Sequence, residues 1–202
     1  MISDYSTLQS AVARWLARAD LTASIPDFIQ LAETRMNFDL KLSPQQAQVS
    51  GTSSGGIITP PNGCRQIQSL LISLDGVQRA IYPVPVEQGT NANLIVLPIG
   101  YTMINGVINL IGSTDTDYVL TYYTGIPSLG SDPGSLQNWL ILAAPNMYLY
   151  ATLLEASVFL RDDQRTALFG QGYTTALAAM QKQDEMLRYG PSPRPRVDFI
   201  TP

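Results

Sequence analysis

Apolar residues recur every three or four positions between residues 5 and 40, a spacing that predicts two amphipathic helices separated by the segment ARADLTAS. The apolar stripe of the first helix consists of Leu8, Val12, Trp15 and Leu16. That of the second consists of Phe28, Leu31, Ala32, Met36 and Leu40. Ser6 and Gln9 fit a capping box at the start of the first helix, while Ser24 and Pro26 suit the start of the second helix. Because short amphipathic helices need a surface to pack on, both stripes are expected to be buried, Trp15 included.

The pattern changes to strands between residues 64 and 125. Two pairs of β-prone runs meet at Asp75-Gly76 and at Asn105-Gly106, and each of these turns is a strong hairpin signal. The run DYVLTYYTG adds a strand with apolar side chains on both faces, which favours burial on both sides. Two hairpins and this strand predict one small, mainly antiparallel sheet. Residues 43–60, rich in Gly, Ser, Gln and Pro, predict a loop or a weak edge strand.

The most apolar stretch, SLQNWLILAAPNMYLYATLLEASVFL, covers residues 135–160. A membrane-spanning helix needs about 20 apolar residues with few polar breaks. Here Pro145 and Asn146 interrupt the run and Glu155 follows inside it. We therefore expect a buried helix to about Leu160, and no membrane. Asp132 or Ser135 can cap that helix.

A last helix is predicted from Asp162 or Asp163 to Leu187, because carboxylates favour a helix start. Its apolar positions are Ala167, Leu168, Leu177, Met180 and Leu187. Gly170 and Gly172 lie inside this helix, where they either bend it or permit close packing.

The final segment, RYGPSPRPRVDFITP, cannot continue that helix. Proline alternates with other residues from 191 to 195, which favours an extended, polyproline-like chain after Gly190. Phe199 and Ile200 follow this run. A loose tail does not need such an apolar pair, whereas an arm that docks on a partner does. Both interpretations stay open on these residues alone.

The elements together predict an α+β fold. Residues 1–42 and 132–188 form an antiparallel helical bundle, residues 43–131 an inserted small antiparallel β domain, and residues 189–202 an extended C-terminal arm.

Composition narrows the classes of function. Charged residues make up 14% of the 202 residues, against about 25% in an ordinary soluble domain. Only Lys41 and Lys182 are lysines, and the other ten of the 12 basic residues are arginines. Arginine is favoured in interfaces because its planar fork is cheaper to desolvate. These features fit a subunit of an assembly, although compositional drift explains them equally well.

The absence of histidine and the presence of a single cysteine, Cys64, exclude most catalytic and metal chemistry. Ser-His-Asp and Cys-His catalysis, imidazole metal ligands and an intramolecular disulfide are all ruled out. Asp115 and Asp117 are expected to form a solvated turn rather than a metal site. No carboxylate pair is selected by the pattern, so we expect neither an enzyme nor a cofactor. The N-terminal residues MISDYSTLQS also lack the features of a signal peptide.

The net charge of −4 argues against a protein that grips nucleic-acid phosphates. Tyrosines at 118, 122, 123, 148 and 150 are better interpreted as core and interface aromatics than as a platform for stacked bases, because basic residues do not alternate with them.

Two long strings resemble tailed-phage head-to-tail adaptor proteins, also described as connector, tail tubular or tail accessory proteins. The first is YSTLQSAVARWLARADLTASIPDFIQLAETRMNFDL. The second is LTYYTGIPSL followed by NWLILAAPNMYLYATLLEASVFLRDDQRTALFGQGYTTALAAM, which is similar to the C-terminal helical hairpin of that family. The resemblance covers most of the chain and is weakest at residues 43–59 and from Tyr189 onward.

The resemblance implies a structural virion protein of the head-tail neck, assembled in the host cytoplasm. Its copies would form a ring, typically of twelve, that joins the portal protein to a tail or nozzle protein. Double-stranded DNA would pass through the ring without sequence-specific binding. The residues expected to carry contact with the portal are Tyr189, Arg194, Arg196, Phe199 and Ile200. Those expected to serve subunit packing are Trp139, Tyr148 and Tyr150.

Two other classes of function compete with this hypothesis. A tail component that binds a receptor or a carbohydrate would expose aromatic side chains on loops, whereas most tyrosines here fall within predicted strands and helices. A cell-wall hydrolase would need a recognisable carboxylate pair.

Overall fold

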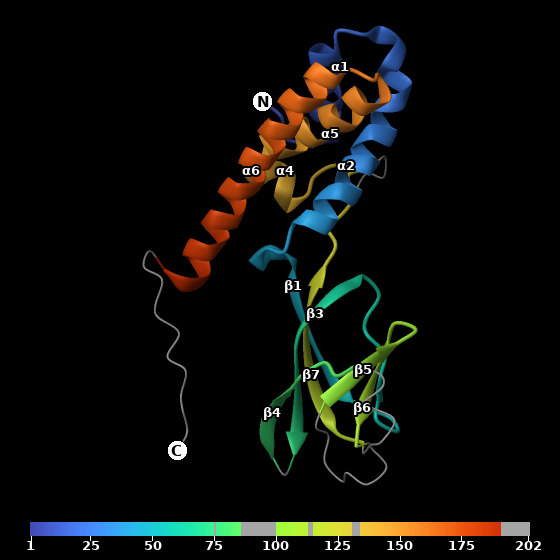
Figure 1. Cartoon of the computed structure of the whole chain (residues 1–202), viewed down its shortest axis with the longest axis vertical. Helices are drawn as coiled ribbons and strands as arrows, with labels where there is room; N and C mark the ends of the chain where they lie inside the picture. The colour runs from blue at the N-terminus through green and yellow to red at the C-terminus, as the bar shows by residue number, and fades with distance from the viewer. Residues whose placement is uncertain (75, 86–99, 113–114, 131–133, 191–202) are drawn as a thin grey trace. The chain divides into compact units, whose positions relative to one another are not determined.

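The computed structural model in Figure 1 describes residues 1–74, 76–85, 100–112, 115–130 and 134–190. The chain is α+β, as the sequence predicts, and it divides into two compact units. Residues 1–44 and 126–202 make up the helical unit, and residues 45–125 make up the sheet unit. The divisions between the two units fall at 44/45 and 125/126.

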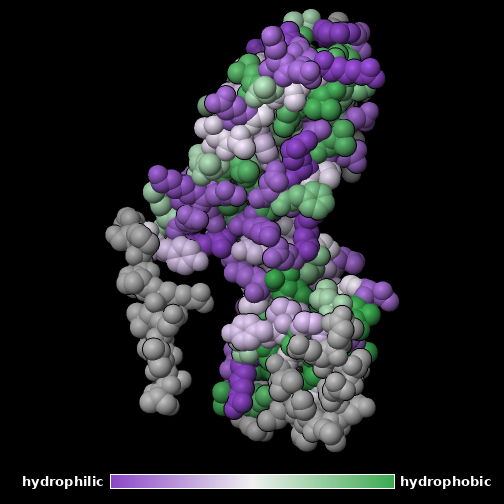
Figure 2. Space-filling model, in the orientation of Figure 1, coloured by the Kyte–Doolittle hydropathy of each residue, from purple (hydrophilic) through white to green (hydrophobic). Residues whose placement is uncertain are grey.

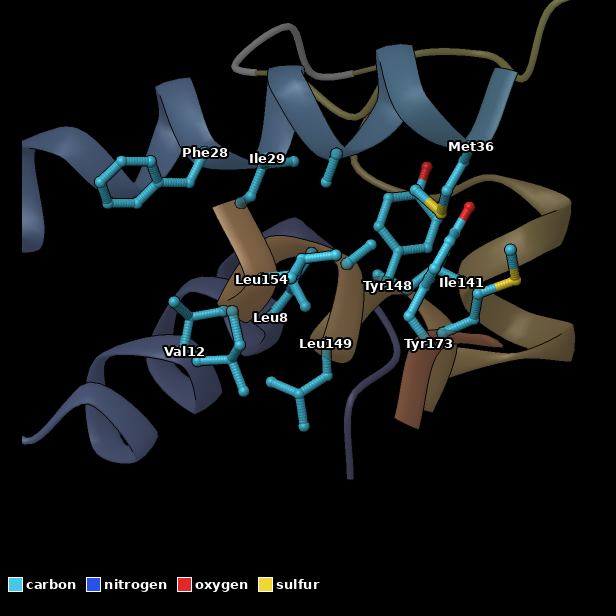
Figure 3. Close-up of a cluster of buried hydrophobic side chains, with 14 of the residues drawn as sticks. Leu8, Val12, Phe28, Ile29, Met36, Ile141, Tyr148, Leu149, Leu154 and Tyr173 are labelled. Carbon is cyan, nitrogen blue, oxygen red and sulfur yellow. The ribbon is translucent and has the colours of Figure 1, made fainter. Parts of the chain in front are cut away.

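The helical unit contains α1 (Tyr5–Leu16), a 3₁₀ turn η1 (Ala19–Ser24), α2 (Ile25–Asp39), α4 (Trp139–Ala143), α5 (Pro145–Phe159) and α6 (Asp163–Tyr189). A second 3₁₀ turn, η2 (Ser43–Gln45), crosses the boundary between the units. Helix α5 packs against α1, α2 and α6. Nine of its 15 residues are buried, so it has no polar face and forms the centre of this core. In Figure 3, side chains from α1 and α2 converge on Tyr148 and Leu154 of α5.

The helix starts differ in part from the predicted ones. Asp4 caps α1, accepting a hydrogen bond from the Thr7 amide at 2.8 Å, so the predicted capping box at Ser6 is wrong. Ser24 precedes α2 without a side-chain capping bond, while Pro26 lies in the first turn as expected. Asp162 caps α6 as expected.

The apolar run 135–160 is two helices rather than one. Asn138 caps α4, and the helical conformation is interrupted at Ala144 before Pro145 begins α5. Pro145 lacks an amide hydrogen and therefore fits a helix start better than a helix interior.

Five apolar positions that the periodicity assigned to the core are exposed, namely Trp15, Leu31, Ala167, Leu168 and Leu187. Trp15 is 50% exposed, Leu31 is 52% exposed and Leu168 is 63% exposed. The stripes predicted for α1 and α2 are otherwise confirmed, because their remaining positions are buried. The stripe predicted for α6 is wrong in register, because none of its positions is fully buried. On α2 the buried positions are Ile25, Phe28, Ile29, Ala32, Glu33 and Met36. On α6 they are Phe169, Tyr173, Ala176 and Asp184.

The sheet unit contains two antiparallel sheets, which corrects the expectation of one. The larger has the strand order β1 (Gln46–Thr52), β7 (Asp117–Thr124), β3 (Cys64–Leu74), β4 (Val77–Ile81). The smaller has the order β2 (Ile57–Ile58), β6 (Val107–Ile111), β5 (Gly100–Ile104). Strand β1 lies at an edge, in agreement with one of the two interpretations of residues 43–60.

Both predicted hairpins are confirmed, β3 with β4 and β5 with β6. Asn105 and Gly106 have φ values of 51° and 77°, the left-handed pair that a type I′ turn requires. Gly76 also has a positive φ of 78°, and Asp75 lies outside the described residues. Leu120 and Tyr122 of β7 are buried, whereas Val119, Thr121 and Tyr123 on its other face are half-buried, so burial on both sides is only partial.

Candidate interaction surfaces

A groove of about 560 Å³ runs along the helical unit where α1, α5 and α6 meet. Trp15 of α1 and Leu168 of α6 are half or more exposed at the groove, and Tyr150 of α5 is half-buried in it. Phe169 also lines the groove, and the other lining side chains are small or polar, including Gly172, Thr175 and Ala179 of α6. Figure 2 shows hydrophobic residues at the surface of the helical unit among hydrophilic ones. An apolar hollow bordered by polar residues is typical of a contact site.

Aromatic contacts organise one end of this groove. The Trp15 ring meets Tyr150 edge-on at a centroid distance of 6.3 Å and lies 6.2 Å from Phe169. Gly172 lets the Tyr150 ring approach α6 closely, because an added Cβ would lie 3.1 Å from three carbons of that ring, a tight contact. Of the two roles considered for glycine in α6, close packing is thus the one observed at Gly172.

A buried polar network lies in the centre of the helical unit. Glu33 accepts hydrogen bonds from the Leu129 amide at 2.7 Å and from the Tyr148 hydroxyl at 3.2 Å. Asn138 donates to that hydroxyl and to the Pro127 carbonyl, each at 2.6 Å. The network therefore ties the returning segment 127–129 to α2, α4 and α5.

Burial is the main cause of the altered acidity in this network. It raises the pKa of Glu33 above its ordinary value of 4.5, although the hydrogen bonds from Leu129 and Tyr148 oppose the change. Burial also raises the pKa of Tyr148, and the nearby Glu33 carboxylate adds to that rise. The arrangement is that of a structural tie, because each polar group is occupied by another protein group.

A second polar cluster holds the outgoing segment 41–43 against the end of α6. The Ser43 amide donates to Asp184 at 2.8 Å, and Asp184 pairs with Arg188 at 2.7 Å. Arg188 also donates to the Ser43 hydroxyl at 2.8 Å and to the Lys41 carbonyl at 3.3 Å. A hollow of about 360 Å³ lies beside these groups and reaches Tyr189. The last described turn of α6 is thereby fixed before the C-terminal segment begins.

The family comparison gives the surfaces their context. The SU10 adaptor protein family matches residues 3–196, which is nearly the whole chain. The chain belongs to this family. No curated protein matches the chain. The match confirms the resemblance to phage head-to-tail adaptors that the N-terminal and C-terminal strings carry.

The residues expected to serve adaptor contacts are found in different environments. Tyr148 is fully buried and Trp139 is half-buried, and both pack in the helical core. Tyr150 is half-buried at the groove and Tyr189 is 66% exposed at the end of α6. The other expected arm residues, Arg194, Arg196, Phe199 and Ile200, lie outside the described residues.

Sequence patterns alone did not single out Glu33, Asn138 or Asp184. Glu33 carried one signal, since it follows Ile29 by four residues and precedes Met36 by three, on the buried side of α2. A carboxylate at such a position needs hydrogen-bond partners, but those partners are distant in sequence.

The sheet unit of this adaptor presents a different kind of surface. A hollow of about 320 Å³ is lined by residues of β1, β3, β4 and β7, including Asp117 and Tyr118. Asp117 accepts a hydrogen bond from the Thr52 hydroxyl at 2.6 Å, and Asp115 accepts one from the Gly55 amide at 2.6 Å. These carboxylates are occupied in turn and strand contacts, as the solvated-turn interpretation predicts.

Two classes of site were searched for among the residues that the structure describes. They contain no group of three or more Cys, Asp or Glu side chains placed to hold a metal ion. None of the described helices combines the length and apolar character needed to cross a bilayer.

Proposed function

We propose that this adaptor is a structural subunit of the phage neck, whose copies form a ring that joins the portal to the tail and continues the DNA channel. Membership of an adaptor family supports the neck role. The observation that supports self-assembly is the groove on the helical unit, where Trp15 is 50% and Leu168 63% exposed. Large apolar side chains gathered in a hollow are stabilised when another protein surface covers them.

The finer parts of this proposal follow from the same role. The helices form an antiparallel bundle that carries the inserted β domain, and the ring contains typically twelve copies. The net charge of −4 suits a channel wall that DNA slides past, because each phosphate neutralised by a protein would add affinity and slow passage. The role requires no catalysis, assembly takes place in the host cytoplasm, and the finished protein resides in the virion.

The segment after Gly190 is proposed to be the arm that binds the portal. Arg194 and Arg196 supply charge, and Phe199 and Ile200 supply apolar anchors. The fixed end of α6, held by Asp184 and Arg188, gives such an arm a firm point of departure.

Native mass measurement of the full chain, alone and mixed with the portal protein, tests the ring. A species many times the 22.0 kDa chain is expected in at least one of the two samples. A monomer in both samples at high concentration would refute the proposal.

Deleting residues 190–202 tests the arm. The truncated protein should remain folded, because the helical core ends before this segment, but it should no longer join the portal. A matched control that lacks only Thr201 and Pro202 should still bind. Normal portal binding by the longer deletion would contradict the assignment of the arm.

A further inference from the structure

A row of exposed residues follows one face of α2, turned away from the core. Asp27, Leu31 and Phe38 lie within about 40° of one another around the helix, at about 100° per residue. Leu31 is 52% and Phe38 71% exposed, whereas the buried residues occupy the opposite side. At about 1.5 Å of rise per residue, Leu31 lies about 6 Å and Phe38 about 16 Å along the axis from Asp27. We call this row the α2 ridge.

The groove on α6 has a matching series of small residues. Gly172, Thr175 and Ala179 line it, and Lys182 follows on the same side of the helix at the next turn. Counted back from Lys182, Ala179 lies about 4 Å and Gly172 about 15 Å away along the axis. The wall of the groove beside Gly172 is aromatic, formed by Tyr150 and Trp15.

The two series complement each other in charge, size and spacing. Neither Asp27 nor Lys182 forms an ion pair with another described residue, and the two charges are opposite. With the helices antiparallel and these charges adjacent, each large side chain of the ridge falls opposite a small residue of the groove. Such interdigitation lets two helices approach closely.

The parallel orientation is less favourable. A parallel register that keeps the size match sets Leu31 opposite Gly172 and Phe38 opposite Ala179, and it places Asp27 opposite the apolar side chain of Leu168. Only the antiparallel orientation combines the size match with the pairing of opposite charges.

We propose that the α2 ridge of one copy lies antiparallel in the α6 groove of a neighbouring copy. This inference rests on the proposed ring and identifies the surfaces that would form it. Both helices pack on α5, but the ridge faces away from α5 while the groove lies along the α1 side of α6. The contact therefore joins two different surfaces, so repetition from copy to copy builds a ring or a filament and not a two-fold dimer.

Cysteine cross-linking tests the contact directly. Leu31→Cys combined with Ala179→Cys, in a Cys64→Ser background, should give a ladder of disulfide-linked oligomers on mild oxidation of the full chain. The sample is oxidised alone and after mixing with the portal protein. The control pair combines Leu31→Cys with Gln181→Cys and leaves Ala179 unchanged. Gln181 lies on a different, exposed side of the same helix. A ladder no stronger than that of the control, in both samples, overturns the inference.

A charge exchange adds a second and independent measurement. Asp27→Lys and Lys182→Asp should each weaken association about fivefold, as expected for an exposed ion pair. The double variant should regain most of the loss, because the pair is restored with its signs exchanged. Single variants that associate like wild type, or a double variant weaker than both, would overturn the proposed register.

Native mass of the wild-type protein separates failure of this inference from failure of the proposed function. A ring without the specific ladder means that copies associate through other surfaces, and only the inference fails. Monomers without a ladder, with and without portal, refute the ring itself. A specific ladder supports the contact.

Discussion

Replacing Tyr148 by Phe removes one oxygen atom from the centre of the helical unit. That oxygen accepts a hydrogen bond from Asn138 at 2.6 Å and donates one to Glu33 at 3.2 Å. Tyr148 is fully buried, so water cannot replace either bond without a rearrangement of the core. The substitution therefore isolates the network from the packing, because the aromatic ring stays.

The magnitude follows from the groups left behind. The Asn138 amide loses one of its two acceptors, and an unsatisfied buried donor costs about 1–3 kcal/mol. Glu33 loses one donor but keeps the Leu129 amide at 2.7 Å, so its added cost lies at the low end for a charged group. We expect the free energy of unfolding to fall by about 2–4 kcal/mol.

Tryptophan fluorescence during urea unfolding measures this loss selectively. The chain has two tryptophans, Trp15 and Trp139, and both belong to the helical unit. The signal therefore follows this unit even if the sheet unit unfolds separately.

Tyr150→Phe is the matched control. It lies on the same helix, and its hydroxyl forms no hydrogen bond with any described residue. That control should shift the free energy by less than about 0.5 kcal/mol. Equal and small effects of Tyr148→Phe and Tyr150→Phe would refute the idea that the network stabilises the core.

Three further variants test other parts of the structure. The pKa of Glu33 is higher in the folded state than in the unfolded state, so the folded protein keeps this proton to higher pH. The free energy of unfolding should therefore fall as pH rises above about 4.5. In urea titrations Glu33→Gln should flatten that fall, whereas the control Glu185→Gln, at an exposed site, should not. Trp15→Ala should lower the free energy of unfolding, followed by circular dichroism, by about 1.5–2.5 kcal/mol. This is half the usual loss for a core aromatic, because half of the Trp15 side chain is exposed. A loss above about 4 kcal/mol would show that Trp15 is buried. Asp184→Ala should cost about 2 kcal/mol and speed hydrogen exchange of the Ser43 amide, and unchanged exchange would contradict the tie.

The parts of the fold that depend on neighbouring residues could be predicted from the sequence. The turn at Asn105-Gly106 requires positive φ at two successive positions, and the chain supplies residues that tolerate it. The start of α6 at Asp162 and its end at Gly190 follow equally local rules. The division into two sheets was missed, because strand pairing across the chain, such as β2 with β6, depends on contacts between distant residues.

The polar network could not be predicted for the same physical reason. Glu33, Asn138 and Tyr148 are separated by up to 115 residues, and each is unremarkable in its own segment. Only the folded chain brings the carboxylate to the hydroxyl and the amide.

The mistaken stripes carry information about assembly. Hydrophobic periodicity registers every apolar face of a helix, and it does not distinguish a face that meets its own core from one that meets another molecule. Trp15, Leu31 and Leu168 were assigned to the core and are exposed. All three fall on the proposed contact, Leu31 on the ridge and the other two in the groove. Ala167 and Leu187 are two further such errors and lie on neither surface. Leu187, 77% exposed, leaves the end of α6 with apolar surface beside the proposed arm. In a monomer the exposed apolar residues on the ridge and in the groove would have no structural role. In a subunit with neighbours they supply the second apolar face that contact with another copy requires.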